Sequence, residues 1–179
     1  MKATGIVRRI DELGRVVIPK EIRRAYKIRV GDPLEIYTDN EGGVVFKKFS
    51  PVGELSKDVK EYAEALSKAT DKTVIICDRD KCVAASGSGK AGLLNRPVSS
   101  GLDDLAVLRA PYLKQEDEVI INGLDGVESS IFALAPIISQ GDILGSVALI
   151  SDTKEGKATE NELTLIKVAA NFLGNSLSE

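Results

Sequence analysis

The chain has 179 residues, of which 43% are hydrophobic and 28% are charged, and its formal net charge at pH 7 is −3. This composition is typical of a globular protein with one domain or two small ones rather than of a disordered chain. The sequence has no apolar run of about 18 residues and no basic-then-apolar leader, so we expect neither a membrane span nor secretion by that route. Its two cysteines, Cys77 and Cys82, are too few for a disulfide framework and suit a reducing cytoplasm.

Charge is distributed unevenly along the chain. Residues 1–50 carry eleven Lys/Arg against seven Asp/Glu, a net charge of +4, which leaves −7 for the remainder. A basic head on an acidic body indicates a module that binds a polyanion, joined to a second part with another role. From charge alone, a solvated basic surface without a partner is the alternative.

The head begins with two β-branched stretches, "TGIVRRI" (residues 4–10) and "GRVVIP" (residues 14–19), which predict two strands separated by a polar turn. The next stretch, "PKEIRRAY" (residues 19–26), predicts a short helix, since Pro is favoured in the first turn of helices. Residues 34–38 and 44–48 alternate around the turn-rich "DNEGG" and predict a β-hairpin.

Four strands and one short helix bury too little apolar surface to fold alone, and the head has no disulfide to compensate. We therefore expect an obligate dimer in which two heads share one core. The apolar positions expected in that core are Ile6, Val16, Ile18, Ile22, Leu34, Ile36, Val45 and Phe46.

The stretch "TGIVRRIDELGRVVIPKEIRR", followed by "GDPLEIY", resembles the AbrB-type swapped-hairpin transcription factors over residues 2–48. The resemblance implies that two chains interleave strands to form one domain that binds double-stranded DNA. Arginine suits this role because its planar guanidinium binds a phosphate or a guanine edge at two points. Ion pairs with Asp11, Glu12 or Glu21 are the alternative role for any single arginine. The implied DNA contacts are Arg8, Arg15, Arg23 and Arg24, with Lys2, Arg9 and Lys20 as accessories.

The stretch "KKFSPVGELS" (residues 47–56) ends the strand-like alternation and starts a helical one. We therefore place the head at residues 1–50, a linker at 51–55 and the body at 56–179. In the body, helical patterns at both ends bracket five strand patterns: "TVIICD", "KCVAASG", "EVIING", "SIFALAPIIS" and "GDILGSVALIS". This order predicts an α+β architecture, with a central antiparallel sheet flanked by helices. The pair "APIISQGDILGSVALIS" resembles the closing hairpin of a GAF domain.

The last helical pattern, which opens with a predicted capping box of Thr159 and Glu162, is apolar on two sides. One side should cover the sheet and the other should meet a helix of a partner chain, with burial wholly inside one chain as the alternative. The pattern does not tell which side faces the partner, and the side opposite Leu173 consists of Leu165, Val168, Ala169 and Phe172. The residues that we assign to oligomerisation, from both helical patterns, are Leu55, Val59, Tyr62, Leu66, Leu163, Ile166, Ala170, Leu173 and Leu177.

The composition argues against an enzyme. The sequence has no histidine, which excludes a Ser-His-Asp triad, a Cys-His pair and histidine metal sites. The stretch "AASGSGKA" (residues 84–91) departs from the phosphate-binding loop pattern at Ala84 and Ala91. We expect no catalytic residue, metal or cofactor, and leave open an unidentified small molecule in the GAF-like body, with residues 92–117 as a pocket wall. Cys77 and Cys82 flank a tight turn and are expected to be buried structural thiols, with a redox switch as the minor alternative.

Head and body together resemble a family of regulators from spore-forming bacteria. The resemblance implies a cytoplasmic regulator of the forespore that activates some genes and represses others. It also implies a homo-oligomer, with a dimer formed through the head and a tetramer formed through helices of the body. An AbrB-like antitoxin is an alternative that shares the head, and a ligand-binding module or enzyme with an incidental basic head is another.

Overall fold

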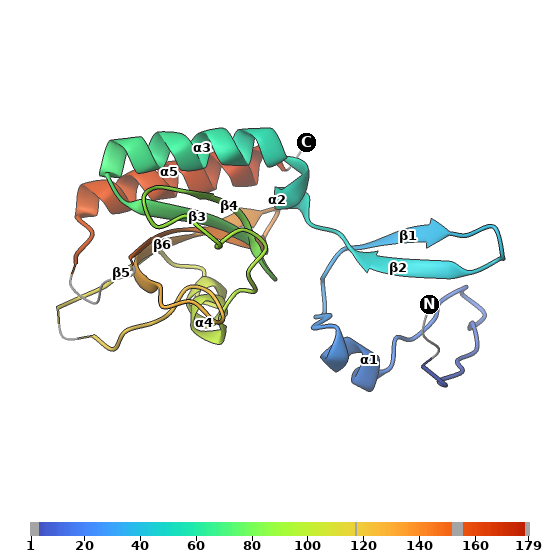
Figure 1. Ribbon diagram of the computed structural model, residues 1–179. Coiled ribbons are helices and arrows are strands. Elements are labelled where there is room, and N and C mark those ends of the chain that lie inside the picture. Colours follow the sequence, from blue (N-terminus) through green and yellow to red (C-terminus); the bar gives the residue numbers. More distant parts are fainter. Residues whose placement is uncertain (1–3, 117, 152–155, 178–179) are drawn as a thin grey trace. The chain divides into compact units, whose positions relative to one another are not determined.

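A computed structural model describes residues 4–116, 118–151 and 156–177 of the chain. It divides into a first unit, Met1–Phe49, and a second unit, Ser50–Glu179 (Figure 1). Residues 51–55, which we expected to be a linker, form the short helix α2 (Pro51–Glu54) and its C-cap, and Val52 is fully buried in the core of the second unit. The domain limits given above stay a prediction.

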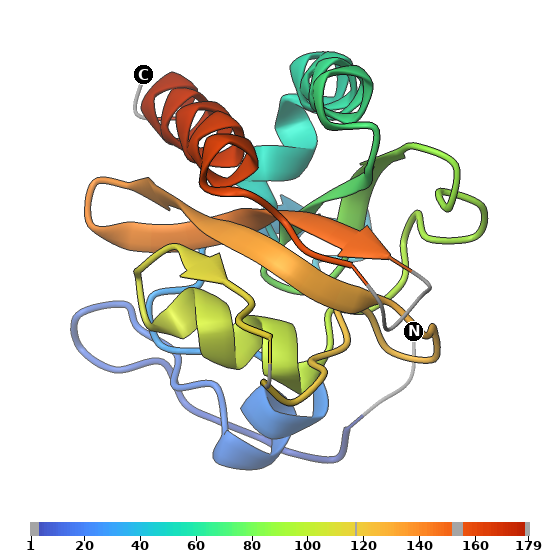
Figure 2. The ribbon, with the colours of Figure 1, turned by 90° about the vertical axis from the view of Figure 1, so that its left-hand side faces the viewer.

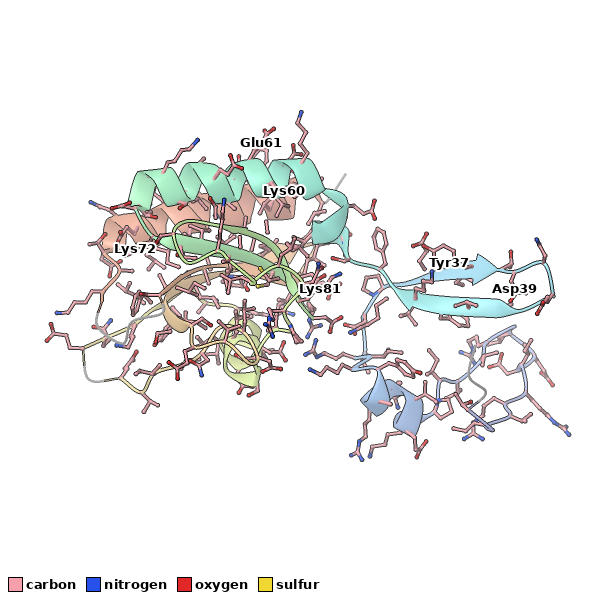
Figure 3. The ribbon with its side chains drawn as sticks, viewed as in Figure 1. Tyr37, Asp39, Lys60, Glu61, Lys72 and Lys81 are labelled. Carbon is pink, nitrogen blue, oxygen red and sulfur yellow. The ribbon has the colours of Figure 1, made fainter. Side chains whose placement is uncertain are left out.

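The first unit contains one helix and one hairpin. Helix α1 (Lys20–Ala25) begins directly after Pro19, and β1 (Leu34–Thr38) pairs with β2 (Val44–Lys48) in antiparallel register. Both elements agree with the sequence. The carboxylate of Asp39 closes the hairpin loop by accepting the backbone N–H groups of Glu41 at 3.0 Å and Gly43 at 2.6 Å. Figure 3 shows Asp39 at the loop end of this hairpin and Tyr37 on β1.

The two strands predicted before α1 are not formed in this single chain. None of residues 4–10 and 14–19, all of which are described, belongs to a strand. Only the turn between them is present, closed by hydrogen bonds from Asp11 N–H to the Arg15 carbonyl at 3.0 Å and from Gly14 N–H to the Asp11 carbonyl at 2.9 Å. A strand needs a hydrogen-bonding neighbour for its backbone, and neither stretch has one in its own chain.

Apolar side chains of the first unit remain exposed. None of residues 4–49 is buried, and the members of the expected shared core are exposed or half-buried. Ile36 is 61% exposed, and Val16 and Phe46 are each 46% exposed. One copy of this unit therefore leaves in water the side chains that a folded core would bury.

A five-stranded antiparallel sheet forms the middle of the second unit, with the strand order β4-β3-β7-β6-β5. This arrangement confirms the central antiparallel sheet and four of the five strand patterns. The long hairpin of β6 and β7 turns tightly at Gln140 and Gly141, whose φ angles are 50° and 87°. The strands are β3 (Thr73–Asp78), β4 (Cys82–Ser86), β5 (Tyr112–Leu113), β6 (Ser130–Ser139) and β7 (Asp142–Ser151).

The prediction of a strand at residues 118–123 is wrong. The edge of β6 is occupied instead by Tyr112 and Leu113, which pair with Leu134 and Ala133. Residues 118–123 reach the sheet through a single isolated bridge between Asn122 and Ser130. Each position on the edge of a sheet accepts one neighbouring strand. Because Tyr112 and Leu113 occupy Leu134 and Ala133, residues 118–123 meet this edge only at Ser130.

Helices cover both faces of the sheet (Figure 2). On one face, α3 and α5 bury Val59, Ile166 and Leu173 against the sheet. On the other face, α4 buries Leu102 and Leu105. Within the described part of the chain, no helix is long and apolar enough to cross a bilayer. The helices are α3 (Ser56–Thr70), α4 (Ser100–Val107) and α5 (Glu160–Ser176).

The stripe that we assigned to oligomerisation lies mainly against the chain's own sheet, which argues against its six buried members as partner contacts. Six of its members are buried in the core, and three are partly buried against it. Side chains packed in their own core are not available to a partner. The buried members are Val59, Leu66, Leu163, Ile166, Ala170 and Leu173, and the partly buried ones are Leu55, Tyr62 and Leu177.

The opposite stripe of α5 faces solvent. Leu165 is 40% exposed, Val168 is 62% exposed and Phe172 is 46% exposed. Ala169, which we placed on this side, is instead buried, at 1% exposure. The ring of Phe172 contacts the ring of Tyr62 on α3, with a centroid distance of 4.9 Å.

Both ends of α5 are fixed. At its start, the capping box is confirmed: Thr159 Oγ1 accepts from Glu162 N–H at 3.2 Å, and the Glu162 carboxylate accepts from Thr159 N–H at 2.7 Å. Lys72 Nζ also pairs with Glu162 Oε1 at 2.8 Å. At its end, a β-carbon on Gly174 would collide with the carbonyl oxygen of Ile138 in β6, so only glycine permits this close approach.

We expect Gly174→Ala to lower the free energy of unfolding by about 1–3 kcal/mol, because the added methyl group forces α5 away from β6. Urea unfolding followed by circular dichroism measures the change. The exposed neighbour provides the matched control, since Asn175→Ala should change stability by less than about 0.5 kcal/mol. Equal stability of the wild type and Gly174→Ala would contradict the close approach.

The ion pair of Glu162 predicts a pH dependence. Burial raises the pKa of Glu162, but hydrogen bonds from Lys72 and Thr159 outweigh it and hold the pKa below its usual 4.5. The stabilisation is therefore complete above the unfolded pKa and is lost as the pH falls through the folded pKa. At pH 7 we expect Glu162→Gln to cost about 1 kcal/mol in urea unfolding. A cost that stays constant well below pH 4.5 would contradict this origin.

Candidate nucleic-acid interface

Arg15 is held by a tight turn. The Asp11 carboxylate accepts the backbone N–H groups of Leu13 at 3.0 Å and Arg15 at 2.8 Å, and it pairs with Arg15 Nε at 2.8 Å. These hydrogen bonds lower the pKa of Asp11, and the one from the Arg15 backbone has the largest effect on it. Gly14 allows the turn because its φ is 76°. The side chain of Arg15 is still 69% exposed, so the turn orients the guanidinium without covering it.

The ion pair with Asp11 was the alternative role for an arginine in this stretch. For Arg15 the structure contains that ion pair. It uses Nε, whereas bidentate recognition of phosphate or guanine uses two guanidinium N–H groups of the planar fork. At an exposed position such a pair contributes little to stability. The pair with Asp11 is therefore compatible with a role of Arg15 in binding an anion.

Arg23 and Arg24 lie in the last turn of α1. Their position suits the negative end of the helix dipole. Beyond the helix, Ile28 N–H donates to the Arg23 carbonyl at 2.7 Å, and Lys27 adopts a positive φ of 50°. The chain therefore turns directly after the two arginines, and Arg24 stays exposed while Arg23 is half-buried.

The other candidate contacts are less constrained. Arg8 and Arg9 are exposed in the extended segment before the turn, and Lys20 is exposed at the first position of α1. Lys2 lies outside the described residues. The structure thus places the candidates on three pieces of the first unit: the segment, the turn and the helix.

Tyr26 escaped the sequence reasoning. It is the C-cap of α1, comes two residues after Arg24 and is 64% exposed. The signal in the sequence was an aromatic residue two positions after a pair of arginines. Lys48, by contrast, has a structural role, because it pairs with Asp32 at 3.4 Å and donates to the Lys27 carbonyl at 2.7 Å.

Among the residues described, no group of three or more His, Cys, Asp or Glu residues is arranged to hold a metal ion. Gly89 N–H donates to Thr73 Oγ1 at 3.0 Å, so the glycine-rich stretch after β4 packs on the start of β3. The layer beneath α4, where we expected any pocket wall, is filled by the chain's own buried side chains, among them Leu93, Leu102 and Leu124.

Comparison with protein families separates the same two parts of the chain. Residues 54–178 match the family described as "Stage V sporulation protein T C-terminal, transcription factor". The chain belongs to this family. Residues 7–48 match the family described as "Antidote-toxin recognition MazE, bacterial antitoxin". The antitoxin match thus stops at residue 48, and the second unit is a folded α+β unit of its own.

Individual relatives support the family. The chain is 45% identical over 181 residues to Stage V sporulation protein T of Bacillus subtilis (strain 168), which covers 100% of both chains. It is 53% identical over 64 residues to the Transition state regulatory protein AbrB of the same organism, covering 32% of this chain and 66% of AbrB. A solved GAF domain region of a putative membrane protein from Geobacter sulfurreducens PCA has a TM-score of 0.52 at 17% identity, covering 71% of this chain and 95% of that chain. This last likeness concerns the fold alone.

Family membership confirms the main conclusions from the sequence. The chain is a sporulation transcription factor with an AbrB-like DNA-binding domain and a GAF-like C-terminal domain, and its fold class is α+β. The family is one of transcription factors rather than enzymes.

Proposed function

We propose that the chain binds double-stranded DNA as a dimer through its first unit and regulates sporulation genes in the cytoplasm of the forespore, activating some and repressing others. The observation that carries the proposal is the exposed state of the first unit. It is basic, its apolar side chains are uncovered, and Arg15, Arg23 and Arg24 lie on a short turn and a short helix. A second copy would cover the apolar side chains and double the number of arginines.

The apolar surface supports a dimer rather than a lone domain. Ile36 and Phe46 are Cα partners across β1 and β2, and both are exposed. Two interleaved chains would bury such pairs and would also give residues 4–10 and 14–19 the strand neighbours that one chain lacks. The same step that forms the core would therefore order the segment that carries Arg8 and Arg9.

The proposed DNA contacts are Arg8, Arg15, Arg23 and Arg24, with Lys2, Arg9 and Lys20 as accessories. Arg15 is the best supported of them, because the hydrogen bonds to Asp11 fix its backbone while most of its side chain stays exposed. A guanidinium that is already oriented loses less entropy when it binds.

Arg15→Ala and Arg23→Ala should each weaken DNA binding and reduce its salt dependence. The slope of log affinity against log salt should be several units in the wild type. It should be smaller by about 2 units in each variant, because each substitution removes two arginines per dimer and each neutralised phosphate contributes about 0.9. Fluorescence anisotropy with a duplex selected by footprinting on genomic fragments measures both quantities. Lys60→Ala provides the control, because Lys60 is exposed on the outer side of α3 (Figure 3). Binding that is indifferent to salt, or equally weakened by Lys60→Ala, would exclude this interface.

We further propose that the second unit joins two dimers into a tetramer through the outer stripe of α5. Leu165, Val168 and Phe172 are spaced as one helical face, and Tyr62 of α3 extends this surface through its ring contact with Phe172. The remaining outer face of α3 is polar, with Lys60 and Glu61 projecting from it. One contact through the first unit and a different one through α5 give each chain two two-fold interfaces, which close as a dimer of dimers.

Phe172→Glu should convert the tetramer into a dimer while the second unit stays folded, because it places a charge in the proposed contact. Its neighbour Leu173 is 0% exposed and faces the sheet, so Leu173→Glu should unfold the second unit instead. Light scattering and circular dichroism distinguish the two results. A wild type that is monomeric at micromolar concentration, or a Phe172→Glu variant that remains tetrameric, would contradict the proposal.

A further inference from the structure

Cys77 and Cys82 face each other across the hairpin of β3 and β4. They are Cα partners in the antiparallel pairing, and both side chains are 0% exposed. The two thiols are in hydrogen-bond contact, and Cys82 Sγ also donates to the carbonyl oxygen of Ala84 at 3.2 Å. The hairpin therefore holds two sulfur atoms side by side in an apolar layer.

The backbone places this pair at a non-hydrogen-bonded position of the ladder. The adjacent pair is closed by a hydrogen bond from Asp78 N–H to the Lys81 carbonyl at 3.0 Å. Cys82 directs its own N–H to the Arg96 carbonyl and accepts from Asn95 N–H, both at 2.9 Å, and so turns away from Cys77. At regular positions of this kind the Cα atoms are about 4.5 Å apart, and here the register shifts next to the pair, between Ile76 and Cys77. Disulfides span Cα separations of about 4.4–6.8 Å, so a bond between these sulfurs needs little movement of the backbone.

We propose that Cys77 and Cys82 form a dithiol that reacts with low-molecular-weight disulfides to give an intrachain disulfide in this hairpin. One thiolate attacks a sulfur of the reagent, which gives a mixed disulfide and releases one reagent thiolate. The second cysteine then loses its proton and attacks the protein sulfur of the mixed disulfide, so that the intrachain bond forms and the second reagent thiolate leaves. Two protein thiols are oxidised, the reagent gains two electrons, and both protons end on the released thiols.

The environment of the pair sets the order of the two steps. The hydrogen bond with Cys82, followed by burial, raises the pKa of the Cys77 thiol well above its ordinary value. Cys77 borders the buried Asp78, whereas Cys82 borders the exposed Lys81, so Cys82 is the first nucleophile to meet a reagent when the turn opens. Because both thiols are buried, the reagent enters only when the turn opens, so oxidation is slow compared with that of an exposed thiol.

A third side chain lies in the same row. Ser146 of β7 is the Cα partner of Cys77 on the other side of β3, and directly paired residues share a face of the sheet. Its hydroxyl is buried and finds no hydrogen-bond partner among the described residues. An unpaired buried donor is costly, and a thiolate forming on Cys77 during the second step would satisfy it.

The turn that would be stiffened by the disulfide also holds the start of the second unit. The buried Asp78 carboxylate accepts the N–H groups of Asp80 at 2.8 Å and Lys81 at 2.7 Å, and the hydroxyl of Ser50 at 2.7 Å. Figure 3 marks Lys81 at this turn. Oxidation of the pair would therefore act on the turn that fixes Ser50, the first residue of the second unit.

The test brings the full chain to equilibrium with glutathione buffers of graded ratio, followed by acid quenching and intact mass measurement. We expect the folded chain to lose two hydrogens with no retained glutathione and no link between chains. The midpoint of oxidation should need a ratio of reduced to oxidised glutathione that is at least about tenfold higher for the folded chain than for the same chain in urea. The reason is that the folded hairpin already holds the two thiols together. A stable mixed disulfide, a link between chains, or a more oxidising midpoint in the folded chain would overturn the proposal.

Single variants test the order of the steps. Cys77→Ala should accumulate a mixed disulfide at Cys82, since no second thiol is present to displace glutathione. Cys82→Ala should stay reduced while folded, because the remaining Cys77 is buried and lies beside the buried Asp78 rather than beside the exposed Lys81. Circular dichroism confirms that both variants fold. The opposite pattern would overturn the assignment of Cys82 as the first nucleophile, and peptide mapping of the wild type must find Cys77 linked to Cys82.

Discussion

The apolar side chains of the first unit are the constraint on which the rest of the molecule depends. A stretch of this length has too much surface for its volume to bury a core of its own. In the single chain none of residues 4–49 is buried, although the hairpin and α1 are formed. The elements that depend on neighbouring residues, α1 and the hairpin, form in the single chain. In the proposed dimer, a second chain supplies the free energy of burying the apolar side chains. In the proposed dimer the DNA-binding surface forms together with the shared core, so dimerisation and DNA recognition would be one event.

The second unit solves the opposite problem. Its sheet is covered on both faces, by α3 and α5 on one side and α4 on the other, and its core needs no partner. The apolar stripe that remains outside on α5 is therefore surplus to folding. A surplus of this kind is what an interface between folded bodies uses. In the proposed assembly the first unit associates in order to fold, whereas the second unit associates after it has folded.

The elements that the sequence predicted well depend on neighbours along the chain. The capping box of Thr159 and Glu162, the hairpin of β1 and β2 and the strand that ends at Asp78 all follow from residues a few positions apart. The failures concern choices made between distant segments. Residues 4–10 lack the strand that would pair with them, and residues 118–123 reach the edge of β6 only at Ser130, while Tyr112 and Leu113 pair farther along it.

The two sides of α5 looked equivalent because both are apolar. A usable signal was nevertheless present, since Ala170 and Gly174 are small residues one turn apart and mark the side that approaches the sheet. At the DNA-binding surface, the arginines could be named from the sequence, but the way Asp11 holds Arg15 could not. That detail depends on the geometry of one turn. The sequence left open whether Arg15 forms an ion pair with Asp11 or contacts DNA.

The hydrogen bond between Ser50 and Asp78 has a mechanical consequence. A load that pulls on the chain from the first unit reaches the second unit at Ser50, and the hydroxyl passes part of it to Asp78 at the end of β3. Strand β3 is hydrogen-bonded on both sides, to β4 and to β7. Tension on β3 is therefore shared between its hydrogen bonds to β4 and those to β7. The attachment point of the DNA-binding half is therefore anchored in one of the interior strands of the sheet, where tension is borne by the whole unit rather than by α2 alone.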